Sequence, residues 1–172
     1  MGISDVALDH LYDGVACRLA AQDYGGALAL LDTFPTEARA EYAFWYLQGE
    51  VLANQGQYDQ ALDSLDRALA LHGNMADIWV AKAVCLLHLS QPQSALRCCE
   101  HALKLQPHHA QAWLFHGVAS HRLGHYHQAY TSYRHALRGQ SPRPQHHPKW
   151  LVYLQQWGIL SKGSSLPDVD HF

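Results

Sequence analysis

Histidine is the side chain in this sequence with the most obvious capacity for chemistry. The chain has 172 residues and 14 histidines, and eleven of these lie between His101 and His171. His121, His125 and His127 are close in sequence, and zinc can be held by three histidines with one further ligand. However, histidines are abundant throughout the chain, which is typical of ordinary solvated side chains. We therefore expect no metal ion and no other cofactor, and keep a histidine-dependent metal or pH-sensing binder as an alternative.

Cysteines and carboxylates give no stronger sign of catalysis. The four cysteines, at positions 17, 85, 98 and 99, form no CxxC pair, so we expect small buried hydrophobic residues in a reducing compartment. The sequence has no glycine-rich phosphate loop, GxSxG elbow or HExxH motif. Paired carboxylates of the kind that act in acid–base catalysis are not evident either. We expect that the protein is not an enzyme.

Charge is divided unevenly along the chain, although the net charge is only −3. Residues 1–72 carry eleven acidic and three basic residues, whereas residues 73–172 carry four acidic and nine basic residues. The second half, which is also rich in histidine, is suited to docking on a partner complex with an acidic surface. Its basic residues are spread too thinly to form a nucleic-acid-binding stripe, so we expect no nucleic acid partner.

Membrane insertion and secretion are not indicated. No apolar run reaches the roughly 18–20 residues that a membrane-spanning helix needs. The first ten residues, MGISDVALDH, lack the basic and apolar regions of a secretory signal. The sequence predicts a cytoplasmic protein with no transmembrane segment.

A period of about 34 residues organises most of the sequence. Large aromatic residues and small residues both recur at this interval, which is the pattern of a repeat protein. The recurring residues are Trp45, Trp79 and Trp113; Gly49, Ala83 and Gly117; Ala61, Ala95 and Ala129; and Ala68, Ala102 and Ala136.

Close helix packing explains why these residue types recur. Two antiparallel helices joined by a short turn approach closely only where small side chains meet. We expect the small residues of the first helix to let the alanines of the second helix approach. Each tryptophan is expected to act as a wedge within its hairpin and against the next one.

The segment AFWYLQGEVLANQGQYDQALDSLDRALAL resembles the consensus of the tetratricopeptide repeat. The resemblance implies an all-α fold, a right-handed superhelix (α-solenoid) of about four helical hairpins with a C-terminal capping helix. The expected units are a degenerate hairpin over 5–34, regular repeats over 40–74, 76–109 and 110–143, a capping helix over 147–161 and a flexible tail over 162–172.

The capping helix is open to two interpretations. In the first interpretation, the helix serves only to cover the apolar face of the last hairpin, as repeat arrays require. However, it is also apolar on its other faces, with Leu151, Val152, Tyr153 and Ile159, which allows self-association through this helix or occupation of the chain's own groove.

In the family, the first helix of each hairpin lines a concave groove. By resemblance, the groove-lining residues are Tyr12, Tyr46, Glu50, Asn54, Val80, Val84, His88, Leu114, Val118, His121 and Arg122. The valines and Leu114 suit an apolar helix or an extended apolar peptide of another protein. Some family members clamp a C-terminal carboxylate, but the matching residues here, Tyr12, Ala16, Leu47, Asp77 and Ala81, cannot supply that clamp.

The resulting interpretation is a non-catalytic protein–protein interaction module, an adaptor, a scaffold or an assembly chaperone. Alternatives are a self-associating structural module that uses its C-terminal helix and an assembly factor for a membrane protein complex.

Overall fold

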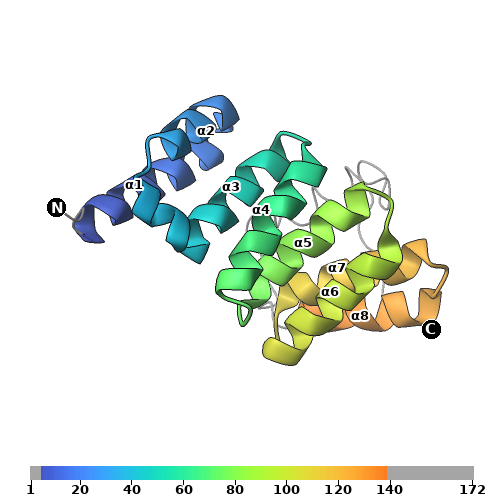
Figure 1. The fold of residues 1–172 in the computed structure, drawn as a ribbon. Coiled ribbons are helices and arrows are strands. Elements are labelled where there is room, and N and C mark those ends of the chain that lie inside the picture. Colours follow the sequence, from blue (N-terminus) through green and yellow to red (C-terminus); the bar gives the residue numbers. More distant parts are fainter. Residues whose placement is uncertain (1–4, 139–172) are drawn as a thin grey trace.

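The computed structural model describes residues 5–138, and this part of the chain is built from helices without strands (Figure 1). The α-helices are α1 (Asp5–Ala20), α2 (Tyr24–Asp32), α3 (Tyr42–Asn54), α4 (Tyr58–Leu71), α5 (Ala76–His88), α6 (Pro92–Leu105), α7 (Ala110–Arg122) and α8 (Tyr126–Arg138), with a short 3-10 helix η1 at Thr36–Ala40. The prediction of an all-α fold is confirmed. The expected capping helix at 147–161, the tail at 162–172 and the end of the unit at 110–143 lie outside the described residues.

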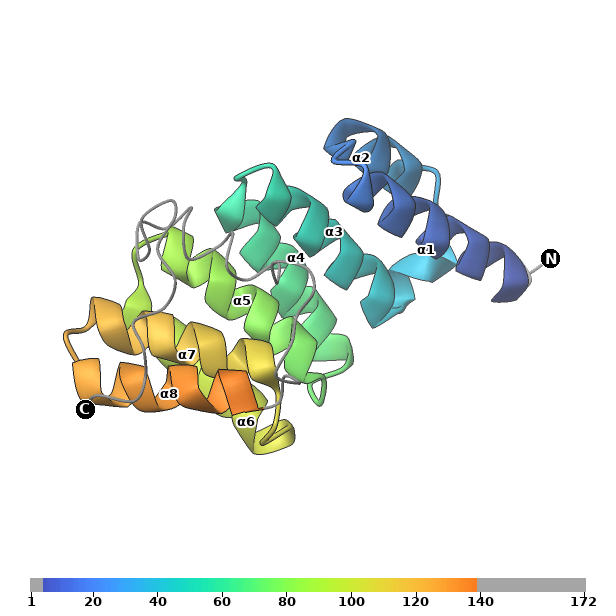
Figure 2. The ribbon, with the colours of Figure 1, turned by 180° about the vertical axis from the view of Figure 1, so that it is seen from behind.

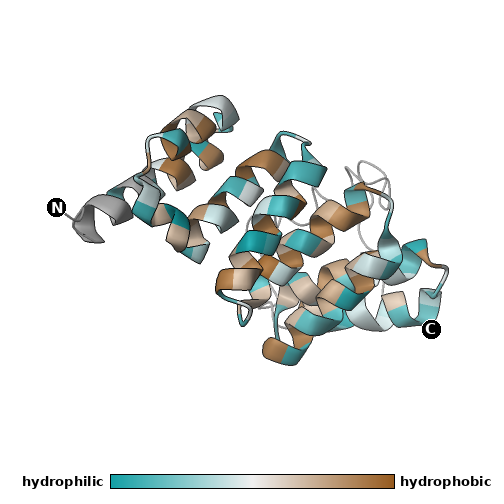
Figure 3. Ribbon diagram, viewed as in Figure 1, coloured by the Kyte–Doolittle hydropathy of each residue, from teal (hydrophilic) through white to brown (hydrophobic). Residues whose placement is uncertain are grey.

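The helices pack as a row of hairpins. α1 packs on α2, α3 on α4, α5 on α6 and α7 on α8, and each second helix also contacts the first helix of the following hairpin. The first helices touch one another as well, since α1 contacts α3, α3 contacts α5 and α5 contacts α7. In Figure 2, α3, α5 and α7 follow one another across the molecule. Figure 3 shows apolar and polar residues interleaved on the helices from α2 to α8, as amphipathic helices require.

The turn inside each hairpin has the same backbone conformation. Gln22, Gly56, Ser90 and Gly124 all have positive φ, between 59° and 79°, and each stands one repeat period after the one before it. Glycine adopts this left-handed conformation without steric cost, whereas other residues are strained there. The shared turn places the degenerate first hairpin in register with the three regular ones.

Each repeated tryptophan is tied to the end of the preceding unit. The indole N–H of Trp45 donates to the carbonyl of Arg39 (2.8 Å), that of Trp79 to Gly73 (3.0 Å) and that of Trp113 to Pro107 (2.8 Å). The acceptor always occupies the same place before the tryptophan, so the three bonds are one interaction repeated. They link each tryptophan to the end of the unit before it, and so help to join consecutive hairpins.

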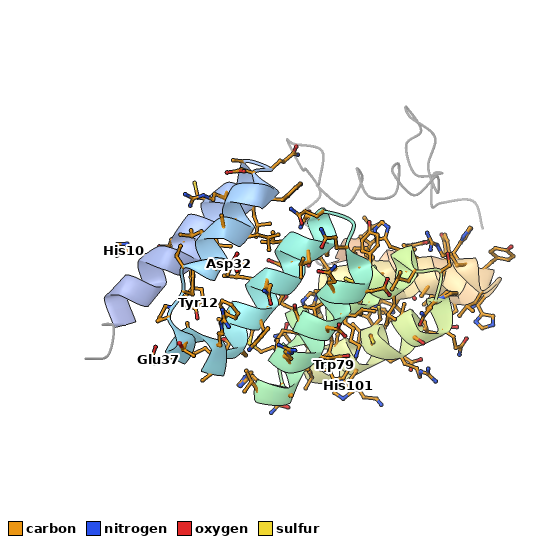
Figure 4. All side chains as sticks on the ribbon, turned by 45° about the horizontal axis from the view of Figure 1, so that its top comes forward. His10, Tyr12, Asp32, Glu37, Trp79 and His101 are labelled. Carbon is orange, nitrogen blue, oxygen red and sulfur yellow. The ribbon has the colours of Figure 1, made fainter. Side chains whose placement is uncertain are left out.

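The face of each tryptophan is covered by a side chain from the second helix of its own hairpin. Arg67 lies 4.5 Å from the centroid of Trp45, and His101 and His135 stack on Trp79 and Trp113 at 4.1 Å and 4.5 Å between ring centroids. Figure 4 shows Trp79 and His101 together on neighbouring helices. His101 and His135 are exposed, as expected for solvated histidines, and they also serve as packing partners of the repeated tryptophans.

The small residues of the first helices face large side chains of the second helices. A methyl group at position 49 would come within 2.8 Å of Leu65 Cγ, and one at position 117 within 2.5 Å of Tyr133 Cε1. The closest side chain is therefore this large residue, and not the repeated alanine one turn before it. The equivalent pair in the third hairpin is Ala83 with Cys99, where a smaller partner accompanies alanine in place of glycine.

The cysteines divide into two groups. Cys85, Cys98 and Cys99 are buried, and burial raises the pKa of the Cys85 thiol to about 12, so these thiols stay neutral. Cys17 is exposed, and the expectation that all four are buried was wrong there. It lies near the end of α1, in the first described hairpin.

No described helix combines the length and the apolar character that a membrane span would need.

We predict opposite effects on stability for Ser90→Gly and Gly124→Ala. Ser90→Gly relieves the left-handed strain and should raise the free energy of unfolding by up to about 1 kcal/mol. Gly124→Ala introduces the same strain and should lower it by about 1 kcal/mol or more. Urea unfolding of the two variants beside the parent protein tests this, and a change of the same sign in both would contradict the shared turn.

We also predict that Gly117→Ala is destabilising because of Tyr133. The added methyl group overpacks the hairpin, which typically costs about 1–3 kcal/mol. The cost should largely disappear in a Tyr133→Cys background, which reproduces the Ala83 and Cys99 pair. A double-mutant cycle of unfolding free energies measures the coupling, and additive effects would show that the two residues do not compete for space.

Candidate binding groove

A hollow of about 660 Å³ lies along the first helices of the hairpins. α3 and α5 supply most of its wall, and residues around the α1–α2 turn, the first residue of α4 and two residues of α7 complete it. The lining residues are Leu19, Ala20, Gln22, Tyr24, Tyr46, Gly49, Glu50, Ala53, Asn54, Tyr58, Asp77, Val80, Ala81, Val84, His88, Gln111 and Phe115.

Six of the residues predicted to line a groove meet in this hollow. Three of them come from one face of α3 and three from the matching face of α5. Each residue of α3 stands one repeat period before its counterpart on α5. The six are Tyr46, Glu50, Asn54, Val80, Val84 and His88.

The other predicted residues lie elsewhere. Leu114 and Val118 do not line the hollow and are only 5% and 1% exposed, within an apolar core that includes Leu86 and Leu87. His121 and Arg122 are exposed near the end of α7, where Arg122 donates a hydrogen bond to the carbonyl of Leu87 on α5.

Tyr12 is also remote from the hollow. It lies on α1 (Figure 4), where its hydroxyl donates to Glu41 Oε2 (2.9 Å) and its ring packs on Phe34 with centroids 5.2 Å apart.

Several lining residues were not predicted as part of the groove. Asp77 and Gln111 are the second residues of α5 and α7 and stand one repeat period apart, so the period itself could have identified them. Tyr24 and Tyr58 are likewise equivalent, as the first residues of α2 and α4. The prediction considered only first helices, and therefore missed these tyrosines.

Glu50 is held in place by its own helix. The Tyr46 hydroxyl donates to Glu50 Oε1 (2.7 Å), and the Asn54 side-chain amide donates to the Glu50 carbonyl (2.8 Å), each one turn away on α3. Burial raises the pKa of Glu50, and the charge of Asp77 raises it further, while the Tyr46 hydrogen bond opposes both. Burial and the neighbouring carboxylates also raise the pKa of Tyr46 well above its usual value.

Asp77 is held by the following hairpin. His109 Nε2 lies 2.9 Å from Asp77 Oδ1, and His109 Nδ1 accepts a hydrogen bond from the backbone N–H of Ala112 (3.2 Å). Because Nδ1 is the acceptor, Nε2 carries the proton and donates to Asp77. His109 thereby caps the N-terminus of α7 and orients a carboxylate on α5, while 49% of the Asp77 side chain stays exposed.

His88 closes the other end of the α5 wall. Its ring stacks on Tyr58 with centroids 4.3 Å apart and an angle of 5°. Burial and the charge of Arg122 lower the pKa of His88, so the ring is neutral at pH 7. The described lining residues include no lysine or arginine, and they therefore give the hollow the negative charge of Glu50 and Asp77.

Among the side chains that the structure describes, no group of three or more histidine, cysteine or acidic residues is arranged to bind a metal ion. Of the three histidines considered in the sequence, His121 packs against Tyr126 instead, with ring centroids 5.3 Å apart.

Comparisons with known proteins identify the repeat. Three family models, each described as tetratricopeptide repeat, match residues 18–75, 52–117 and 110–138. The chain belongs to the tetratricopeptide-repeat family. The matches cover the regular hairpins and reach into the degenerate first hairpin. The family is in general a non-catalytic fold for protein interaction. A search of curated proteins found no match.

Solved structures of tetratricopeptide-repeat proteins share the fold. MamA from Desulfovibrio magneticus is 19% identical, with a TM-score of 0.67 over 74% of this chain and 72% of that chain. The OM64 TPR domain of Arabidopsis is 25% identical (TM-score 0.58, 60% of this chain and 85% of that chain). The second TPR domain of RPAP3, bound to the HSP90 peptide SRMEEVD, is 21% identical (TM-score 0.56, 59% of this chain and 94% of that chain).

We predict that Glu50→Gln raises the melting temperature at pH 7. The pKa of Glu50 is higher in the folded than in the unfolded state, so the ionised carboxylate destabilises the fold above the folded pKa. The rise in melting temperature caused by Gln should shrink as the pH falls through the raised pKa of folded Glu50. It should vanish below the pKa of glutamate in the unfolded chain, about 4.3. Melting curves between pH 4 and pH 8 measure this.

Asp63→Asn, at an exposed position of α4 outside the hollow, is the matched control. A lower melting temperature for Glu50→Gln at pH 7 would show that Glu50 supports the fold and does not strain it.

Proposed function

We propose that the protein holds a helix or an extended segment of a partner protein in the hollow between α1, α3, α5 and α7. The observation that carries this proposal is the hollow itself, about 660 Å³ in volume and lined by side chains of four consecutive hairpins. A volume of this size suits several side chains of a peptide.

The composition of the wall supports a peptide ligand. Ala53, Ala81 and Val84 offer half-buried apolar surface, while Asn54, Gln111 and the two carboxylates offer polar groups at its edge. Apolar surface with a few fixed polar groups is the usual composition of a site that binds and orients a ligand. The peptide bound to the RPAP3 domain, which shares this fold, is consistent with such a role.

The proposed role is binding and not catalysis, as in the family generally. An adaptor, a scaffold, an assembly chaperone and an assembly factor for a membrane complex would all use the hollow in this way, and a cytoplasmic location stays a prediction. The alternative of self-association depends on residues 147–161, outside the described part of the chain.

The test is to fill the hollow. Ala81→Trp places a large side chain in the wall of α5, and we expect it to abolish capture of the partner from a lysate of the native cells. Ala70→Trp, at a position of α4 that does not line the hollow, should capture the partner like the parent protein. Circular dichroism melting establishes that both variants are folded.

A partner that is still captured by folded Ala81→Trp would show that the hollow is not the binding site. Val118, although predicted as a groove residue, is unsuitable for such a test, because a charge introduced at a core position would unfold the hairpin.

A further inference from the structure

Two carboxylates on adjacent first helices face the hollow, and no lysine or arginine is among its described lining residues. We propose that Glu50 and Asp77 form an acceptor site for one basic side chain, an arginine or a lysine, of the bound partner segment. This inference rests on the proposed function, because it names the chemistry that the same hollow recognises.

The first step concerns the charge on Glu50. Its Oε1 accepts the Tyr46 hydroxyl, but no described lysine or arginine forms an ion pair with it. A half-buried carboxylate without a cation is unfavourable, and it is retained only at some cost to the fold. A cation supplied by a ligand would remove that cost.

The second step concerns Asp77. It stands on α5, opposite α3, and its charge is near enough to Glu50 to raise the pKa of that carboxyl group. His109 fixes Oδ1 of Asp77, and half of the side chain is still exposed. The two carboxylates therefore come from neighbouring hairpins and are both oriented by hydrogen bonds before a ligand arrives, which reduces the entropy lost on binding.

The third step concerns the surroundings. Ala53, Ala81 and Val84 provide apolar wall around the acceptors, which suits the methylene stem of a lysine or arginine better than a small hydrated cation. The histidine that lines this wall, His88, is neutral at pH 7 because burial and Arg122 lower its pKa. It therefore does not cancel the negative charge.

The same charges disfavour acidic peptides. The peptide SRMEEVD, seen bound to the RPAP3 domain, carries three acidic side chains against a single arginine, and is therefore acidic overall. Like charges brought together at an interface are strongly unfavourable. We expect this peptide not to bind here, although the fold is shared.

The experiment selects peptides without assuming a sequence. Random dodecapeptides displayed on phage are panned against the full chain, and the enriched peptides are synthesised and titrated by calorimetry. We expect enrichment of arginine or lysine at one position, and replacement of that residue by norleucine should weaken binding about tenfold or more.

Variants then assign the effect to the acceptor site. Glu50→Gln should lower the affinity for the basic peptide about tenfold or more, but it should hardly change the affinity for the norleucine peptide. The substitution in the protein and the replacement in the peptide are then coupled. Asp77→Asn should act in the same direction, and the control Asp63→Asn should have no effect. The peptide SRMEEVD should show no heat of binding.

The outcomes separate this inference from the proposed function. Enriched peptides that are blocked by Ala81→Trp, but need no basic residue or ignore Glu50→Gln, would overturn the acceptor site and leave the groove intact. Peptides that bind folded Ala81→Trp as well as the parent protein, or a panning that enriches none, would count against both. Binding of SRMEEVD that Glu50→Gln leaves unchanged would overturn the acceptor site.

Discussion

The contact between each repeated tryptophan and the end of the preceding unit is the interaction on which the array depends. The indole N–H reaches a carbonyl of that unit, and the ring is covered by Arg67, His101 or His135 from the second helix of its own hairpin. One side chain therefore fixes the preceding hairpin and its own second helix at once. Because nearest-neighbour contacts are all that join the hairpins of a repeat protein, this contact sets how each hairpin follows the last.

Side-chain volume within each hairpin is a second constraint, and it works together with the first. Gly49 faces Leu65 and Gly117 faces Tyr133, so the larger partner occupies the space that a methyl group would need. With the spacing of the helices fixed in this way, residues at equivalent positions of α3 and α5 come to face one hollow. The hollow is thus a consequence of packing within the hairpins, to which Gly49 contributes while it also lines the wall.

The periodic residues made the helical hairpins and part of the hollow predictable, since the tryptophans and glycines act through contacts that recur from one repeat to the next. The period does not reveal which neighbouring side chains bury a given position. Leu114 and Val118 repeat the positions of Val80 and Val84 but do not line the hollow, and Val118 is fully buried where Val84 is half-buried. Hydrogen bonds such as that of His109 with Asp77 depend on side-chain placement across hairpins, which no spacing along one helix reveals.

The charge in the hollow shows where the requirements of the fold and of binding differ. A protein selected only for stability would gain by replacing Glu50, because burial and Asp77 both disfavour its ionised form. Tyr46 and His109 instead hold the two carboxylates in position through hydrogen bonds to their oxygens. Groups that are oriented but not neutralised make sense as part of a site completed by a ligand, and the complementary charge is then what the ligand contributes.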